Sequence, residues 1–159
     1  MPDTKFADEA KIMKSLFNND DRSHLSERLD ILTQESKPQW GKMNCEQMLA
    51  HVADSIRMSL GELPAQPRGG LLRFRPLRHA IIYWLPFPKG APTAPELLAR
   101  SAEDCTCEVI DIKSLLERFA ARDEIQEWPA HPAFGQLSRK DWGVLVYKHI
   151  DHHLRQFGV

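Results

Sequence analysis

Residues 137–157, LSRKDWGVLVYKHIDHHLRQF, decide how the rest of the chain is interpreted. At about 100° per residue, this stretch forms a helix in which His149 and His153 fall within roughly 20° of Trp142, at the centre of the apolar face. Asp151 lies on the opposite, solvent side, and His152 lies near the edge of the apolar face. Two imidazoles in the middle of an apolar face need polar partners, because burying an unpaired polar ring costs free energy.

These two histidines are one helical turn apart. Side chains four residues apart on a helix are neighbours, so His149 and His153 can bind one metal ion together. The alternative is that each ring donates a hydrogen bond to a backbone carbonyl or to a buried side chain. The helix alone leaves both interpretations open.

The spacing of apolar residues predicts an all-α chain, because strand patterns are nearly absent. Helices are predicted over residues 6–17, 23–34, 44–61, 106–122 and 138–157. Asn18-Asn19-Asp20-Asp21 is expected to break the first helix, and Ser23 to cap the second. Asn44 with Gln47, and Ser138 with Asp141, have the spacing of capping boxes.

We interpret residues 62–105 as an insertion between the helices of a bundle. Residues 71–85 are strongly apolar and mostly helical in pattern, with Pro76 expected to interrupt the helix near its start. Residues 86–95 are rich in proline and should run as an extended surface segment. The insertion either covers the mouth of a pocket or is a long connection without a chemical role.

Length and composition favour one globular domain over residues 1–159, large enough for a hydrophobic core. With 21 Lys and Arg against 22 Asp and Glu, the net charge of −1 gives no electrostatic reason to expect nucleic acid or a membrane surface as a partner. The basic cluster of Arg68, Arg73, Arg75 and Arg78 is too short and too mixed with apolar residues to change this expectation.

The chain shows no segment of roughly 20 apolar residues and no signal-peptide core at its N-terminus, which favours a cytoplasmic location. The three cysteines, Cys45, Cys105 and Cys107, are an odd number without the paired spacing of a metal site. We therefore expect free thiols, and any metal to be bound without cysteine.

A third histidine stands on another predicted helix. His51 lies at the border of the apolar face of helix 44–61, beside Asp54. If this helix faces the last one, His51 can join His149 and His153, and three neutral imidazoles would hold a divalent ion with at least one position open. Imidazole suits zinc, nickel, iron and copper, so the ligand type does not identify the ion.

Several motifs of the chain closely resemble one branch of the DinB-like superfamily. They are the turn WGKM at 40–43, His51, FPKGAPTA at 87–94, HPAFGQL at 131–137 and HIDHHLRQFG at 149–158, and the resemblance covers about residues 22–159. It implies a four-helix bundle of up-down-down-up topology with a metal held by His51, His149 and His153. Characterised relatives in the superfamily include thiol S-transferases and an isomerase that use low-molecular-weight thiols, but the resemblance assigns no activity to this branch.

Four further side chains carry weaker predictions. Asp54 is a candidate catalytic base or a partner of a ligand imidazole, against the simpler interpretation of a solvated carboxylate at a helix edge. His131 is either a turn residue bonded to the backbone or a pocket residue. Trp84 and Trp142 are expected in the core or in a pocket wall.

Two functions fit this sequence. The first is a metal-dependent enzyme of hydrolase or thiol S-transferase type, in which the ion activates water or a small thiol toward a small-molecule substrate. The second is a non-catalytic metal-binding or stress-associated helical interaction module, such as a homodimer, whose histidines are structural groups.

Overall fold

The computed structural model describes residues 13–91, 93, 95–98, 100–123 and 126–159. Within these ranges the regular structure is helical, which confirms the predicted all-α class. The elements are α1 (Asn19–Leu29), α2 (Cys45–Leu60), η1 (Leu71–Arg73), α3 (Arg75–Tyr83), η2 (Pro95–Leu98), α4 (Cys105–Ala121) and α5 (Arg139–Gln156), where η marks a 3-10 turn. None of the described helices has both the length and the apolar character needed to cross a membrane.

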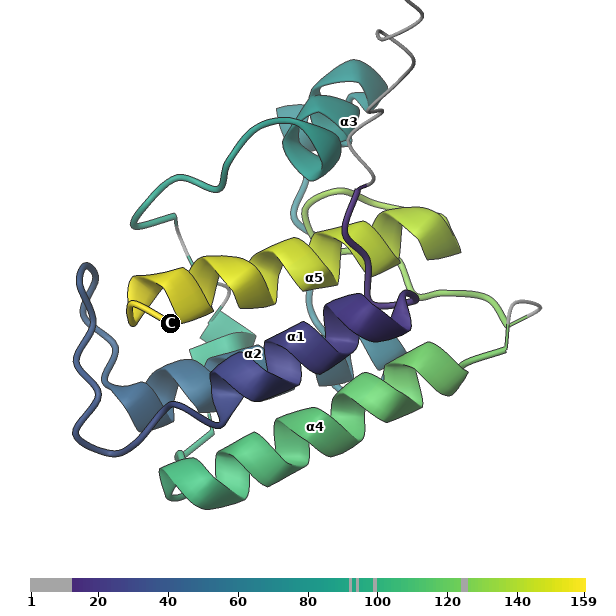
Figure 1. Cartoon of the computed structure of the whole chain (residues 1–159). Coiled ribbons are helices and arrows are strands. Elements are labelled where there is room, and N and C mark those ends of the chain that lie inside the picture. Colours follow the sequence, from purple (N-terminus) through teal and green to yellow (C-terminus); the bar gives the residue numbers. More distant parts are fainter. Residues whose placement is uncertain (1–12, 92, 94, 99, 124–125) are drawn as a thin grey trace, which may run out of the picture.

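Helices α1 and α2 each pack against both α4 and α5 (Figure 1). One stripe from each helix is buried between them, as the 3–4 spacing of apolar residues predicts. The largest fully buried side chains include Leu25, Leu29, Met48, Leu49, Ile56, Ile112, Leu115, Leu116, Phe119 and Trp142. This packing fixes α2 beside α5, and so it sets the distance between His51 and the two histidines of α5.

Both predicted capping boxes are present, and they set the starts of the two helices that carry the histidines. At α2, Asn44 Oδ1 accepts from Gln47 N at 2.8 Å, and Gln47 Oε1 accepts from Asn44 N at 3.0 Å. At α5, Ser138 and Asp141 exchange the equivalent pair of bonds, both at 3.1 Å. Each pair satisfies two backbone N–H groups that have no partner within the helix.

The predicted start of the helix at 23–34 is wrong. Asn18 and the acidic residues after it open α1 instead of breaking a helix, because Asn18 Oδ1 accepts from Asp21 N at 3.0 Å and acidic side chains suit the positive end of the helix dipole. Ser23, the predicted cap, lies inside α1, and the helix ends at Leu29.

The predicted helix over 6–17 falls mainly on residues outside the described ranges, and residues 13–18 are not helical. Leu16 is fully buried, and its N–H donates to the Gly143 carbonyl of α5 at 3.1 Å. A side chain at position 143 would collide with Ser15 and Phe17, so Gly143 permits this close approach. A contact distant in sequence thus replaces the local helical pattern.

The insertion contributes α3 and η2 to the fold. Helix α3 packs on α5, and η2 packs on α2. Pro76 does not interrupt α3, because it lies in the first turn, where its missing N–H would have no partner anyway. The ammonium of Lys148 on α5 donates to the carbonyls of Ile81 and Leu85, and so holds the C-terminal end of α3 against α5.

Candidate metal centre

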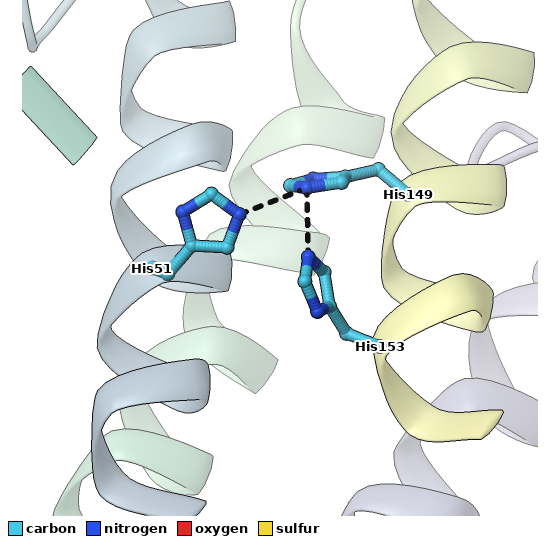
Figure 2. Close-up of side chains that lie close together, drawn as sticks. All are labelled: His51, His149 and His153. Atoms are coloured by element: carbon cyan, nitrogen blue, oxygen red, sulfur yellow. Dashed lines mark hydrogen bonds between the residues drawn. The ribbon is translucent and has the colours of Figure 1, made fainter. Parts of the chain in front are cut away.

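Three imidazole rings from two helices meet at one point between α2 and α5 (Figure 2). His149 Nε2 lies 3.0 Å from His51 Nε2 and 3.1 Å from His153 Nε2. One ligand atom from each ring lies within 4.8 Å of the other two, as a shared metal ion requires. The structure therefore brings together the three histidines that the sequence analysis selected.

Ser55 determines which nitrogen of His149 carries the proton. The Ser55 hydroxyl donates its single hydrogen to the Val52 carbonyl at 2.7 Å. It can therefore only accept at its other contact, His149 Nδ1 at 3.1 Å. His149 is thus protonated on Nδ1, and its Nε2 presents a lone pair to the other two rings.

Gln156 fixes His153 in the same way. The Gln156 amide nitrogen donates to the Trp40 carbonyl at 2.7 Å, so its oxygen Oε1 faces His153 Nδ1 at 2.8 Å. An amide oxygen only accepts, so His153 Nδ1 carries the proton and Nε2 is again a lone pair. Gly41 permits this arrangement, because a side chain there would collide with the Gln156 amide.

The nitrogens of His149 and His153 therefore face each other as two acceptors with no hydrogen between them. Two lone pairs 3.1 Å apart repel unless a cation lies near both. Ligand histidines in metal sites use one ring nitrogen for the metal and donate from the other, which is the arrangement of these two rings. The donor set fits a divalent metal ion.

His51 completes the set with a buried ring. Its Nδ1 has no hydrogen-bond partner of normal geometry among the described residues. Burial lowers the pKa of His51 to about 4, although a polar contact with the Leu97 backbone in η2 opposes the shift. His51 is therefore neutral at pH 7 and can offer either nitrogen.

Burial keeps the two histidines of α5 neutral as well. It lowers the pKa of His153 to about 3, with a smaller contribution from the neighbouring His51. Burial, followed by the charges of His153 and His51, holds the pKa of His149 well below its usual value. Neutral imidazole is the form that binds metals, so no proton competes strongly for the site at neutral pH.

The cluster is most open to solvent at His149, which is half-buried, whereas His51 and His153 are buried. Aromatic rings stand on this side: Phe87 of the insertion lies 6.4 Å from His149 and 5.9 Å from His152 between ring centroids. Trp40 packs edge-on to His152 at 6.0 Å, and Lys89 Nζ lies 4.3 Å over the Trp40 ring. His152 is thus part of the surroundings and not a member of the cluster.

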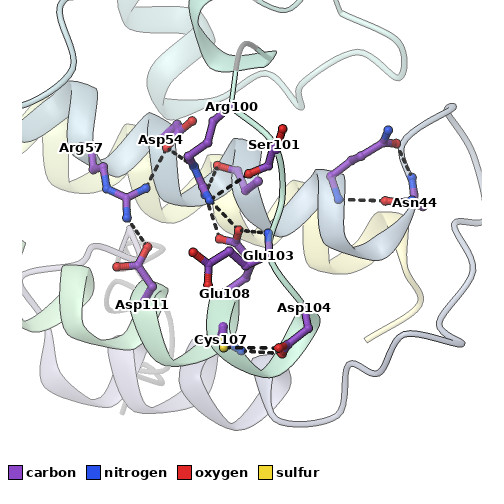
Figure 3. A network of polar contacts seen from close by, with 12 residues as sticks. Asn44, Asp54, Arg57, Arg100, Ser101, Glu103, Asp104, Cys107, Glu108 and Asp111 are labelled. Carbon is purple, nitrogen blue, oxygen red and sulfur yellow. Dashed lines mark hydrogen bonds and ion pairs between the residues drawn. The ribbon is translucent and has the colours of Figure 1, made fainter.

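Asp54 belongs to a separate network of charges (Figure 3). It is 5% exposed, so the interpretation as a solvated carboxylate is wrong. Its Oδ1 accepts from Arg57 at 2.7 Å and from Arg100 at 3.2 Å. Its predicted role as a catalytic base has no supporting hydrogen bond to a histidine among the described residues, and so it stays a prediction.

Arg100 links this network to α4. Its two terminal nitrogens donate to both oxygens of the buried Glu108, at 2.7 and 2.8 Å. Arg57 also binds Asp111 of α4. The network therefore ties the end of the insertion to α2 and α4, close to the η2 segment that contacts His51.

The remaining sequence predictions have mixed outcomes. His131 Nδ1 accepts from the backbone N–H groups of Ala133 and Phe134, both at 3.1 Å, which confirms a turn residue. Trp142 is buried as predicted, but Trp84 is 72% exposed, so its placement in the core is wrong; it lines the wall of a surface hollow instead. The three cysteines are free thiols outside the histidine cluster, and metal binding without cysteine stays a prediction.

The sequence analysis missed Ser55 and Gln156. A signal was available for both, since Ser55 lies one turn after His51 and Gln156 lies three residues after His153, at positions that are neighbours on a helix. Only the packing of α2 against α5 shows that Ser55 serves His149 and not the histidine of its own helix.

Comparison with known proteins assigns the chain to a family. No curated protein and no solved structure matches it. The family described as "Protein of unknown function (DUF1569)" matches residues 13–158, a range that includes the three histidines, Ser55 and Gln156. The chain therefore belongs to the DUF1569 family.

Proposed function

We propose that this chain holds a divalent metal ion between the Nε2 atoms of His51, His149 and His153, and uses it in a reaction on a small molecule. One observation carries the proposal: His149 and His153 present facing lone pairs, because Ser55 and Gln156 keep their protons on Nδ1. Two acceptors that face each other in a protein interior are stabilised when a cation is shared between them.

The identity of the ion follows from the ligands only in part. Three imidazoles suit zinc, nickel or iron, and three protein ligands leave at least one coordination position open. When bound, the ion supplies Lewis acidity toward water, a thiol or a substrate oxygen. The half-buried edge of His149 is the side from which such a molecule would arrive.

The reaction class that we propose is hydrolysis or thiol S-transfer, with a low-molecular-weight thiol as a candidate co-substrate. The support is the resemblance to the DinB-like superfamily, together with a ligand set drawn from α2 and α5. The same resemblance underlies our proposal that α1, α2, α4 and α5 form a four-helix bundle of up-down-down-up topology. Function does not follow from fold alone, so the activity needs a direct test.

The first experiment measures the metal content of purified protein by elemental analysis and by calorimetric titration with zinc, nickel and ferrous ions. We expect one ion per chain, and its loss in His149→Ala. His152→Ala is the matched control, since it removes an imidazole from the same helix and should keep the ion. A chain that binds no ion, or a His149→Ala variant that retains it, would contradict the metal site.

The second experiment separates an enzyme from a structural metal protein. Screening the metal-loaded chain with small thiols and electrophiles should reveal turnover that disappears in His149→Ala. If His149→Ala loses the ion and the fold collapses with it, the metal has a structural role, and the non-catalytic interpretation gains support.

A further inference from the structure

Helix α3 lies at the edge of the molecule (Figure 1). The side chains exposed around it differ in kind from those of the metal centre. Of the eight large hydrophobic side chains exposed in the described residues, five lie between positions 71 and 85. They are Leu71 (81% exposed), Leu72 (38%), Phe74 (65%), Trp84 (72%) and Leu85 (48%). Together with Arg73, Arg75 and Arg78 they form what we call the arginine–apolar patch.

The arginines of the patch line two adjoining hollows. The larger hollow, of about 580 Å³, is lined by residues that include Arg73, Arg75, Arg78, Phe134 and Leu137. The smaller, of about 460 Å³, shares Arg75 and Arg78 and adds Ile82 and Trp84. Positive charge and exposed apolar surface are therefore neighbours in space as well as in sequence.

The positive charge of the patch is poorly neutralised. Asp141, the carboxylate that lines both hollows, already accepts from the Tyr83 hydroxyl at 2.7 Å and from Ser138 N at 3.1 Å. Arg78 donates to the neutral carbonyls of Phe134 and Gln136. Within the part of the chain that the structure describes, Arg73 and Arg75 form no ion pair. The exposed Arg73 and Arg75 and the half-buried Arg78 thus have one carboxylate among them.

Charge complementarity selects the partner of this patch. In a two-fold symmetric dimer the same patch faces itself, which would place these arginines against their own copies. Single-stranded nucleic acid would match the charge, but its bases stack on aromatic rings, whereas three of the five apolar side chains are leucines. Interleaved arginine, leucine, phenylalanine and tryptophan is the composition of segments that lie in a membrane interface.

We propose that the arginine–apolar patch binds the surface of an anionic lipid bilayer, with lipid phosphates at Arg73, Arg75 and Arg78 and the apolar side chains in the boundary between headgroups and acyl chains. The net charge of the whole chain, −1, hides this local excess of positive charge. The proposal is independent of the metal centre, because none of these residues touches the three histidines.

The test is co-sedimentation of the full chain with vesicles. One set contains phosphatidylcholine alone, and the other contains equal parts of phosphatidylcholine and phosphatidylglycerol. We expect binding to the anionic set, weakened by salt, and little binding to the neutral set. Tryptophan fluorescence should shift to the blue on binding, because Trp84 is exposed, whereas Trp40 is half-buried and Trp128 and Trp142 are buried. In Trp84→Phe the binding should persist and the shift should disappear.

Matched variants locate the binding surface. Removal of both charges in Arg73→Gln/Arg75→Gln should weaken binding about thirtyfold, at about fivefold per basic side chain. Arg118→Gln, an exposed arginine on α4, should bind like the natural chain. Leu71→Ser/Phe74→Ser should weaken binding, whereas Ile110→Ser, which removes an exposed apolar side chain of α4, should not.

Five results would overturn the proposal. The first four concern vesicle binding and the oligomeric state. They are equal binding to both vesicle sets, no binding to either, unchanged binding of the double arginine variant, and a dimer in light scattering that Phe74→Ser converts to monomer. Preferential binding of a single-stranded oligonucleotide in competition with anionic vesicles would also assign the patch to another partner. The full chain is used, so coverage of the patch by residues 1–12 would abolish vesicle binding and count against the proposal.

Discussion

The histidine cluster and the charge network around Arg100 both join separate segments of the chain through polar side chains. Only in the network do the hydrogen-bond donors and acceptors satisfy one another. In the network, guanidinium groups meet the carboxylates of Asp54, Glu108 and Asp111, so donors face acceptors (Figure 3). In the cluster, nitrogens that lack a proton face one another (Figure 2). A set in which donors meet acceptors has a structural role, whereas two facing acceptors such as His149 Nε2 and His153 Nε2 favour a shared cation.

The largest expected effect that distinguishes the two regions is their dependence on pH in the metal-free chain. Burial lowers the pKa of His51 to about 4 and of His153 to about 3, so these imidazoles are harder to protonate in the folded chain than in the unfolded one. His131, a turn residue outside the cluster, adds to the same effect, because burial lowers its pKa to about 4. Their contribution to the free energy of unfolding is fully present above about pH 6.5, the pKa of histidine in the unfolded chain. It is lost as the pH falls toward the pKa values of the folded chain. For a shift of this size the loss is on the order of 3 kcal/mol per imidazole.

The network should lose stability in a lower pH range. Burial raises the pKa of Glu108, but the hydrogen bonds from Arg100 and the Glu103 N–H, together with the charges of Arg100 and Arg57, outweigh burial and leave the pKa below its usual value. Its contribution is therefore present above the unfolded pKa of 4.5 and is lost only as the pH falls below that value. Urea unfolding of the metal-free chain at several pH values should show loss of stability beginning near pH 6.5; a flat profile down to pH 5 would contradict the assignment of buried neutral histidines.

The next effect is loss of the network itself. Arg100→Ala removes the guanidinium partner of the buried Glu108 and one of the two arginine partners of Asp54, which should cost about 3 kcal/mol of unfolding free energy. Metal stoichiometry should stay at one ion per chain, because Arg100 binds no histidine in the cluster. Arg68→Ala is the control, since it breaks an exposed pair with Glu96 and should change stability by less than about 1 kcal/mol. Equal effects of the two substitutions on unfolding would contradict this account.

Substitutions of Ser55 and Gln156 should have the opposite outcome to Arg100→Ala: they should weaken metal binding and change the stability of the fold little. Ser55→Ala removes the acceptor that keeps the proton of His149 on Nδ1. It should therefore weaken zinc binding by about ten to a hundredfold in calorimetric titration. Ser59→Ala is a closely matched control, because Ser59 makes the same hydrogen bond to a carbonyl three residues earlier and is also buried, but serves no histidine. If Ser55→Ala and Ser59→Ala change zinc affinity equally, Ser55 has no orienting role.

Gln156→Leu is expected to give a similar loss through His153. The substitution removes the acceptor of His153 Nδ1 and the donor to the Trp40 carbonyl, so it should also loosen the loop at 38–41 slightly. Gln136→Leu provides the control, since its amide donates to the Trp128 carbonyl away from the cluster. Zinc affinity should fall only in Gln156→Leu; a fall in both variants would point to a general effect on stability.

The sequence predicted the features that depend on local spacing. The all-α class, the capping boxes at Asn44 and Ser138, and the position of His149 and His153 on one helix face all follow from periods of three and four residues. It also selected His51 from its place at the border of an apolar face, and the structure places this ring beside His149 and His153.

The failures concern contacts between residues that are far apart in the chain. Residues 13–17 have a helical pattern, but the approach of Leu16 to Gly143 holds them in another conformation. Asp54 looked exposed on its own helix, and it is buried by Arg100, 46 residues later. Trp84 looked like core, yet it lies at the end of α3, where no other helix covers it within the described part of the chain. Local patterns carry no information on such partners.

The protonation of the imidazoles can be observed directly by nitrogen-15 NMR of the histidine side chains. In the metal-free chain, His149 and His153 should both carry the proton on Nδ1 and leave Nε2 bare, and one equivalent of zinc should shift the Nε2 signals of His51, His149 and His153 together. A proton on Nε2 of His149 or His153, or an equivalent of zinc that leaves the three signals in place, would contradict the shared cation on which the proposed function rests.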